Sequence, residues 1–138
     1  MPVRDSFHTH VRHALERDGW TITHDPLRLN VRRRKLYVDL GAERLLAAEK
    51  GLRKIAVEVK TFTGPSDVKD LEDAVGQFVV YDHALRRAEP DRSLYLAVPE
   101  PIWQIVFADS LGEILIDDQV LRVLTFDPAE EVITRWIP

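Results

Sequence analysis

The stretch KLYVDLGAERLLAAEKGLRKIAVEVKTF, residues 35 to 62, decides the fold predicted for this chain. Asp39 follows three residues of strand character, and Glu58-Val59-Lys60 closes a second strand-like run. Successive side chains of a strand point to opposite faces of a sheet, so Glu58 and Lys60 share one face while Val57 and Val59 point into a core. The pattern predicts a carboxylate and an ammonium held side by side, with a second carboxylate on the neighbouring strand.

Two carboxylates on neighbouring strands suit a hard divalent cation. Mg²⁺ takes one or two carboxylates and completes its shell with water and substrate phosphate oxygens. Asp39 and Glu58 are therefore the expected metal ligands, and such a metal would activate a water for attack on a DNA phosphate. Lys60 would orient that water or stabilise charge on the phosphate. The alternation is equally typical of a half-buried strand with one solvated face, in which Glu58 and Lys60 form only a surface pair.

Length and composition indicate one domain, residues 1–138, with 45% hydrophobic and 30% charged residues. The absence of cysteine excludes disulfides, thiolate zinc sites and cysteine nucleophiles. A formal net charge of −4 limits any DNA contact to a local basic patch. No apolar run is long enough to span a bilayer and the first residues lack the apolar core of a signal peptide, so a cytoplasmic protein without membrane contact is expected.

Periodicity predicts a mixed sheet covered by two main helices. The expected helices cover residues 6–18, 66 or 67 to about 87, and 102–111. The expected strands cover 20–23, 27–31, 35–40, 55–62, 93–98, 121–126 and 132–137, with 45–48 a strand or part of a broken hairpin.

Two polar groups near the amino terminus have alternative interpretations. His8, Arg12 and Glu16 form an i, i+4 stripe on the first helix. His8 and Glu16 are secondary site candidates, although the histidine spacing does not converge on one metal and favours solvated surface. The basic run 32–35 is either a phosphate-contacting hairpin tip or a solubilising turn.

The order of Asp39, Glu58-x-Lys60 and a following helix resembles the PD-(D/E)xK nuclease superfamily over residues 6 to about 98. The resemblance implies a restriction-endonuclease-like core of order αβββαβ, followed here by an extra helix and strands. It also implies that Asp39 and Glu58 bind the divalent metal and that Lys60 assists the attacking water. The chain departs from the family in having Val38 where proline often stands, and in the long separation between the two acids. Glu43 or Glu49 is therefore an alternative first acid.

The second expected helix carries the pattern Gln77-x-x-x-Tyr81, which is similar to that of RecB-type members of this superfamily. The resemblance implies that Gln77 and Tyr81 contact the metal shell or the DNA backbone. The sequence then predicts that Leu71, Val75, Phe78 and Val79 pack against the sheet. In the alternative, Tyr81 is buried and Gln77 lies in solvent.

More narrowly, the chain resembles the XisH family, the cyanobacterial fdxN-element excision controlling factors. The stretches that carry this resemblance are Arg4-Asp5-x-Phe7-His8, residues 18–27 (DGWTITHDPL), residues 37–43 (YVDLGAE), residues 55–60 (IAVEVK) and residues 95–99 (YLAVP).

This resemblance implies a role in programmed DNA excision beside a site-specific recombinase, with an XisI-like companion protein. Two functions follow as hypotheses. One is a DNA endonuclease dependent on Mg²⁺ or Mn²⁺. The other is a catalytically inactive nuclease-fold regulator that binds a partner. A homo-oligomer is an open alternative for the assembly.

Overall fold

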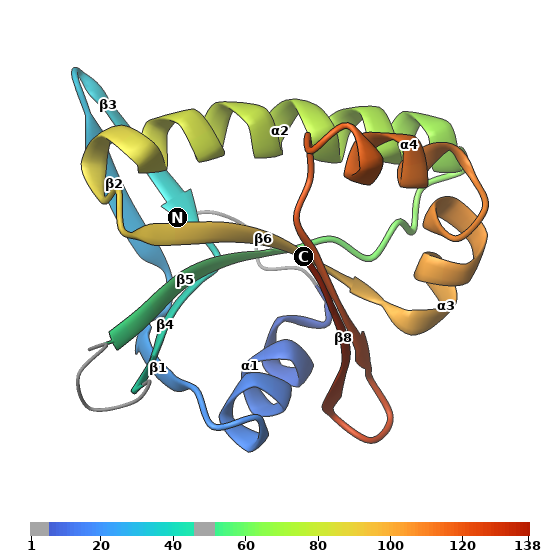
Figure 1. Cartoon of the computed structure of the whole chain (residues 1–138), viewed down its shortest axis with the longest axis horizontal. Helices are drawn as coiled ribbons and strands as arrows, with labels where there is room; N and C mark the ends of the chain where they lie inside the picture. Colours follow the sequence, from blue (N-terminus) through green and yellow to red (C-terminus); the bar gives the residue numbers. More distant parts are fainter. Residues whose placement is uncertain (1–5, 46–51) are drawn as a thin grey trace.

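The structure is a computed structural model, and it describes residues 6–45 and 52–138 (Figure 1). The helical elements are α1 (His8–Arg17), α2 (Asp67–Ala88), α3 (Glu100–Ile102), the π-helical turn η2 (Trp103–Phe107) and α4 (Leu111–Asp117). The strands are β1 (Thr21–His24), β2 (Leu27–Val31), β3 (Arg34–Val38), β4 (Leu40–Leu45), β5 (Leu52–Val59), β6 (Arg92–Pro99), β7 (Val123–Asp127) and β8 (Val132–Ile137). Within the described residues, no helix is long and apolar enough to cross a membrane.

Six strands form one mixed sheet in the order β1-β4-β5-β6-β7-β8. Strands β1, β4 and β5 pair antiparallel, β5, β6 and β7 pair parallel, and β8 returns antiparallel to β7. A parallel pair needs a crossover connection, and α2 supplies it between β5 and β6. Ser66 caps this helix by accepting a hydrogen bond from the backbone N–H of Lys69.

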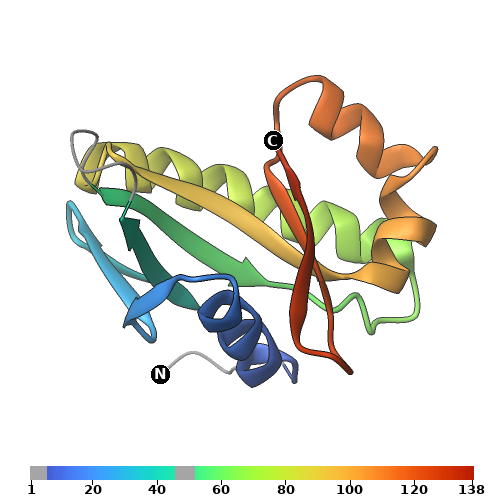
Figure 2. The same ribbon diagram turned by 60° about the horizontal axis from the view of Figure 1, so that its bottom comes forward.

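Both faces of the sheet are covered, because α1 and α2 lie on opposite sides of it (Figures 1 and 2). On the α2 side, Ala56 packs in a core with Leu71 and Phe78. On the α1 side, Val57 and Val59 pack in a second core that also contains Leu15. A mixed sheet flanked by helices is thus confirmed, and the central strand β5 is buried on both faces from Ile55 to Val59.

Strands β2 and β3 form a separate two-stranded hairpin beside the main sheet. Leu27 and Leu29 are buried in the core on the α2 side, which fixes the base of the hairpin. The tip carries Arg32 and Arg33, which are exposed and project from the body of the molecule (Figure 1, upper left). The basic run therefore lies at the tip of a hairpin, a position that is common to both interpretations of it.

The expected helix over residues 102–111 is helical only as far as Phe107, and its continuation to Leu111 is wrong. The chain instead forms α3 and η2, breaks at Ala108–Ser110, and begins α4 at Leu111. Asp109 adopts a positive φ of 52°, a conformation that a continuing helix excludes. The largely apolar run 102–107 did not reveal this break.

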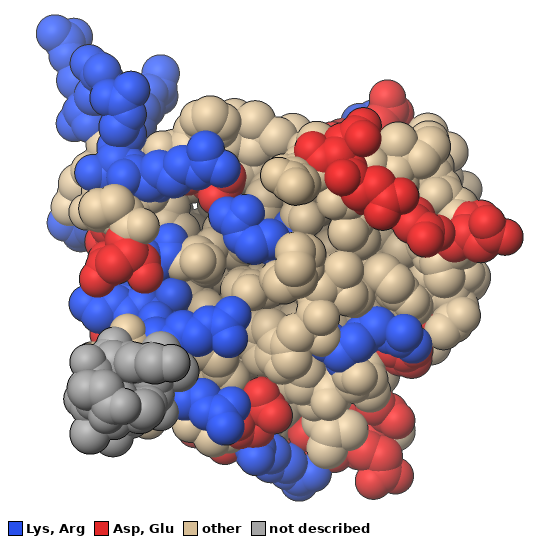
Figure 3. Space-filling model, in the orientation of Figure 1, with Lys and Arg blue, Asp and Glu red and all other residues tan. Residues whose placement is uncertain are grey.

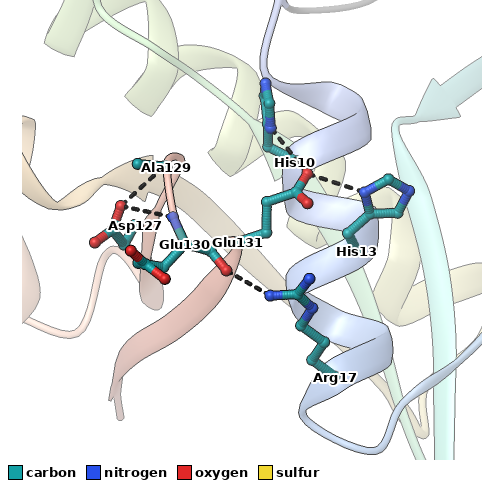
Figure 4. A network of polar contacts seen from close by, with 7 residues as sticks. All are labelled: His10, His13, Arg17, Asp127, Ala129, Glu130 and Glu131. Atoms are coloured by element: carbon teal, nitrogen blue, oxygen red, sulfur yellow. Dashed lines mark hydrogen bonds and ion pairs between the residues drawn. The ribbon is translucent and has the colours of Figure 1, made fainter.

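Helix α1 is attached to the turn between β7 and β8 by polar contacts (Figure 4). His10 Nδ1 and His13 Nδ1 each lie 2.9 Å from the same Glu131 oxygen, and Arg17 donates to the Glu130 carbonyl. These hydrogen bonds hold the Glu131 pKa below its ordinary value. The network joins the start of the chain to its last hairpin and so closes the fold around the sheet.

Candidate functional site

The first candidate ligand, Asp39, lies at the bend where the hairpin passes into the main sheet, and not within a strand as predicted. The register that pairs Leu40 with Val57 places Asp39 beside Glu58 at the next step along the ladder. The Asp39 backbone N–H donates to Glu58 Oε1 at 3.1 Å, and the Val59 N–H donates to Asp39 Oδ2 at 2.8 Å. Reciprocal bonds to the backbone therefore hold the two carboxyl groups together.

Glu58 is buried, with only 6% of its surface exposed. The Glu58 side chain points to the α2 side of the sheet. The alternation predicted that Glu58 and Lys60 share this face. The face is covered by protein rather than exposed to solvent. The pKa of Glu58 is raised to about 8, first by burial and then by the neighbouring Asp39 carboxylate, while Lys60 opposes the shift. A surface pair of Glu58 and Lys60 is thereby excluded, because a solvated carboxylate would show no such desolvation.

Lys60 lies just beyond the end of β5, since the strand stops at Val59 and not at Phe62 as predicted. Its backbone N–H still donates to the Ala97 carbonyl at 2.9 Å, which continues the pairing with β6. Lys60 lines a pocket of about 200 Å³ whose other charged residues are Asp70 and Asp73 of α2. The lysine is thus placed between the buried carboxyl pair and an open, polar hollow.

The loop that follows Lys60 is fixed by contacts on both sides. Phe62 is buried and packs edge-on against Phe107 at 6.1 Å between ring centroids. It holds a positive φ of 56°, an unfavourable conformation for an aromatic residue that the packing must maintain. The Gly64 N–H donates to Asp70 Oδ2 at 2.9 Å. The loop is therefore preorganised, and so is the backbone that carries Lys60.

Gln77 and Tyr81 are on α2 but are not part of the Lys60 pocket. Ala74 lines that pocket and Gln77 lies about one turn further along the helix, partly exposed. Tyr81 packs, partly buried, against the apolar core. Leu71, Val75 and Phe78 do belong to the core side of α2, whereas the prediction for Val79 is wrong because it is 39% exposed.

Of the alternative first acids, Glu43 does not lie beside Glu58. Glu43 lies on β4 opposite Lys54, three residues away in register from the Leu40–Val57 pair. Its carboxylate is 3.6 Å from the buried Arg92, which ties it to the start of β6. Glu49 lies outside the described residues. Among the described acids on the first strands, Asp39 is the one that contacts Glu58.

The interpretation of His8 as solvated surface is wrong. His8 is only 3% exposed, and its Nε2 lies 2.7 Å from Asp25 Oδ1. Arg12 donates to the other Asp25 oxygen at 2.7 Å, so two members of the predicted stripe hold the turn after β1. Glu16, the third member, is exposed as expected. His8 lies among apolar residues of the helix, and the sequence did not indicate that Asp25 would be its partner.

The donor set is compatible with a hard cation such as Mg²⁺ or Mn²⁺. Asp39 and Glu58 supply two carboxyl groups, and a side-chain hydrogen bond between them raises the Glu58 pKa. A bound cation would offset the repulsion between the two like charges, which helps to raise the pKa of Glu58. In residues 6–45 and 52–138, no cluster of three or more acidic, histidine or cysteine ligands exists. Two carboxylates suit Mg²⁺, which retains water and phosphate ligands, better than a cation that needs an all-protein cage.

Asp70 and Asp73 are site residues that the sequence analysis did not identify. Both line the Lys60 pocket, and Asp73 also accepts from Lys69 at 2.5 Å. Acidic residues are common in the first turns of helices, where they favour the helix dipole, so their type alone gave no indication of a site. Only the crossover that brings α2 back over β5 places them beside Lys60.

Comparison with known proteins gives one family and two similar structures. The sequence model of the XisH protein family matches residues 1–134. An XisH family protein from Nostoc punctiforme PCC 73102 is 43% identical, with a TM-score of 0.84, covering 97% of this chain and 100% of that one. A fdxN element excision controlling factor protein from Anabaena variabilis is 44% identical, with a TM-score of 0.84, covering 98% and 100% of the two chains. No curated protein matches significantly.

Proposed function

Since the chain belongs to the XisH family, we propose that it is a metal-dependent DNA endonuclease-like protein of the PD-(D/E)xK type that helps to control the excision of a DNA element. The observation that carries this proposal is the buried Asp39–Glu58 carboxyl pair beside Lys60. The name of the Anabaena variabilis relative, a fdxN element excision controlling factor, supplies the biological setting.

The order of elements supports a restriction-endonuclease-like core. If the β2–β3 hairpin is treated as an insertion, the main sheet is built in the order α1, β1, β4, β5, α2, β6. This is the αβββαβ order that the superfamily resemblance implies. Asp39 then precedes the second strand of the core, and Glu58 and Lys60 lie at the end of the third.

Each residue of the site has a distinct task in this proposal. A bound Mg²⁺ or Mn²⁺ supplies Lewis acidity toward a phosphate oxygen and lowers the pKa of a bound water. Asp39 and Glu58 hold the cation, and Glu58 must release its proton to do so. Lys60 faces the pocket, where its ammonium stabilises negative charge on the phosphate in the transition state. The fixed loop after Lys60 keeps that charge in place.

The DNA-contacting surface in this proposal is the basic end of the molecule. Exposed cations gather on the hairpin and at the nearby end of α2: Arg28, Arg32, Arg33, Arg34, Lys35, Arg86 and Arg87. Arg32 and Arg87 line one pocket together, which shows that the hairpin tip and the helix end are adjacent. Figure 3 shows the blue side chains of this end at the upper left. Such a patch can contact several phosphates although the whole chain is acidic.

The test is cleavage of supercoiled and linear DNA by the purified protein with Mg²⁺ or Mn²⁺. Wild type should cut, while Lys60→Ala and Glu58→Gln should lose activity because each removes a group that acts in the transition state. Lys54→Ala is the matched control, since Lys54 lies on the same strand but pairs with Asp91 at 3.6 Å and lies outside the pocket. Absence of cutting on every DNA form would refute the endonuclease proposal.

A second candidate function is a catalytically inactive regulator with a nuclease fold, which binds an XisI-like companion or a recombinase. The observation that favours it is the net charge of −4, which leaves only one basic end for DNA. In that case the protein co-purifies with the companion and gives no DNA shift at low salt. A DNA shift that Arg33→Glu abolishes would count against the regulator.

A further inference from the structure

A groove between α2 and α4 is lined almost entirely by apolar side chains. Its walls are Leu71, Glu72 and Val75 from α2 and Leu111, Ile114 and Leu115 from α4, and it encloses about 350 Å³. Along α2 the apolar positions 68, 71, 75 and 79 recur at helical spacing, so the groove continues as a stripe on this helix. The groove is distinct from the Lys60 pocket, because the two share no lining residue.

Several apolar side chains in and beside this groove are exposed to solvent, although Leu71 is buried. Leu111 is 49% exposed, Ile114 is 55% exposed and Val68 is 54% exposed. Covering a half-exposed leucine or isoleucine removes apolar surface from water and so stabilises a complex. Two such residues on one face of the short helix α4 do little for the stability of the free chain. They are suited to an interface, because contiguous exposed apolar surface is typical of interaction sites.

The charge around the groove is strongly negative. Carboxylates occur at the start of α2 and along the α4 region: Asp67, Asp70, Glu72, Asp73, Asp109, Glu113, Asp117 and Asp118. Residues 93–121 contain no lysine or arginine, and Lys69, the one cation in residues 61–85, is paired with Asp73. Figure 3 shows acidic side chains across the upper right, where Figure 1 places α4 and the start of α2.

We propose that the α2–α4 groove binds an amphipathic helix of a partner protein, with an apolar stripe flanked by lysine and arginine. A groove between two helices accepts the side chains of a third helix at i, i+3, i+4 and i+7 spacing. The surrounding carboxylates select a basic partner and set its association rate. The carboxylates of the α4 region, Glu113, Asp117 and Asp118, repel DNA and acidic lipid surfaces. A second copy docked face to face would oppose one acidic rim with another.

The probe is a synthetic stapled helical peptide with leucines at i, i+3 and i+7 and lysines on either side, labelled for fluorescence anisotropy. Wild-type protein should bind this peptide at low salt. A peptide with glutamates in place of the lysines should bind at least about tenfold more weakly. Ile114→Glu should weaken binding of the lysine peptide at least about tenfold, because it places a charge in the apolar contact. Leu52→Glu is the control, since Leu52 is 51% exposed on β5, outside the groove.

A second readout locates the contact and separates it from the DNA chemistry. The methyl signals of Ile114 should shift on addition of the lysine peptide, and circular dichroism should show that the Ile114→Glu protein is folded. DNA binding should be unchanged by Ile114→Glu, and peptide binding should be unchanged by Arg33→Glu. The groove proposal is therefore tested independently of the nuclease proposal. Equal binding of both peptides, or no effect of Ile114→Glu, would overturn it. So would a wild-type dimer in light scattering that Ile114→Glu dissociates, because a second copy would then cover the groove.

Discussion

At the scale of single residues, Glu58 combines two opposing properties. Its carboxyl is buried against the core and lies beside a second carboxyl, so the protonated form is favoured and its pKa rises to about 8. A metal ligand must be ionised, and binding therefore releases a proton. In the proposed function Glu58 is a metal ligand, and the burial that raises its pKa lowers the stability of the metal-free protein as the pH rises towards 8.

Replacing Glu58 with glutamine should stabilise the metal-free protein at about pH 9 by about 1–3 kcal/mol, because the substitution removes a buried charge and retains a hydrogen-bonding side chain. The folded pKa of about 8 lies above the ordinary value of 4.5, so stability is complete below pH 4.5 and is lost as pH rises through 8. Denaturant unfolding of both proteins at about pH 5 and pH 9 measures the difference. Equal stabilities at both pH values would contradict the buried-charge account.

The affinity of the site for Mg²⁺ should rise with pH because the cation competes with the Glu58 proton. We expect about a tenfold increase per pH unit below the Glu58 pKa of about 8, followed by a plateau above it. Isothermal titration calorimetry in buffers of different ionisation enthalpy measures both the affinity and the released proton. In Glu58→Gln the pH dependence should disappear together with most of the binding. A pH-independent affinity in wild type would place the cation elsewhere.

At the scale of elements, the joint between η2 and α4 fixes one wall of the apolar groove. Gly112 is buried there, and a Cβ at this position would lie 2.5 Å from a Phe107 ring carbon and 2.8 Å from the Val106 carbonyl oxygen. The close approach leaves no room for a side chain. Phe107 also stacks on Trp103, so the ring cannot yield easily. The position of α4 therefore depends on a residue without a side chain.

Gly112→Ala should lower the free energy of unfolding by about 1–3 kcal/mol through overpacking at this joint. Gly76→Ala is the matched control, because a Cβ at Gly76 would meet no atom within 4 Å and alanine favours the helix by about 0.5–1 kcal/mol. The two substitutions are chemically identical and should have opposite signs. Thermal unfolding of wild type, Gly112→Ala and Gly76→Ala measures both effects. A stabilised Gly112→Ala protein would show that α4 packs less closely than described.

At the scale of the whole molecule, charge is separated along α2. The start of the helix carries Asp67 and Asp70, and its end carries Arg86 and Arg87 beside the basic hairpin. This arrangement also favours the helix dipole at both ends. A chain with net charge −4 thus presents one basic end and one acidic end (Figure 3). We expect nucleic acid at the first and a basic protein at the second.

Arg33→Glu at the hairpin tip should weaken DNA binding and reduce the slope of log affinity against log salt by about 1. Lys69→Glu makes the same change of charge at the acidic end and should leave the slope unchanged. Fluorescence anisotropy with one duplex over a range of salt concentrations measures both. Stability should be unaffected by Arg33→Glu because the side chain is exposed. Equal slopes for the two variants would indicate that the hairpin tip does not contact phosphates.

Local pattern was sufficient for much of this protein. The structure contains helices α1 and α2, which the 3.6-residue period predicted, and strand β2, which the alternation predicted, close to the predicted bounds. The turns around Pro26 and Gly64 also lie where the turn residues predicted them. The prediction that Glu58 and Lys60 share one side of β5 also followed from alternation alone. These features depend on neighbours within a few residues, which a sequence contains directly.

Other features were decided by the tertiary structure alone. The burial of Glu58 requires α2 to cover β5, the contact of Asp39 with Glu58 requires the β4–β5 register, and His8 is buried because Asp25 folds back onto it. Each joins residues that are distant in the chain. The residue types and their local order were determined by the sequence itself. The desolvation that makes Glu58 chemically distinct arose only when the crossover through α2 covered the face of the sheet to which Glu58 points.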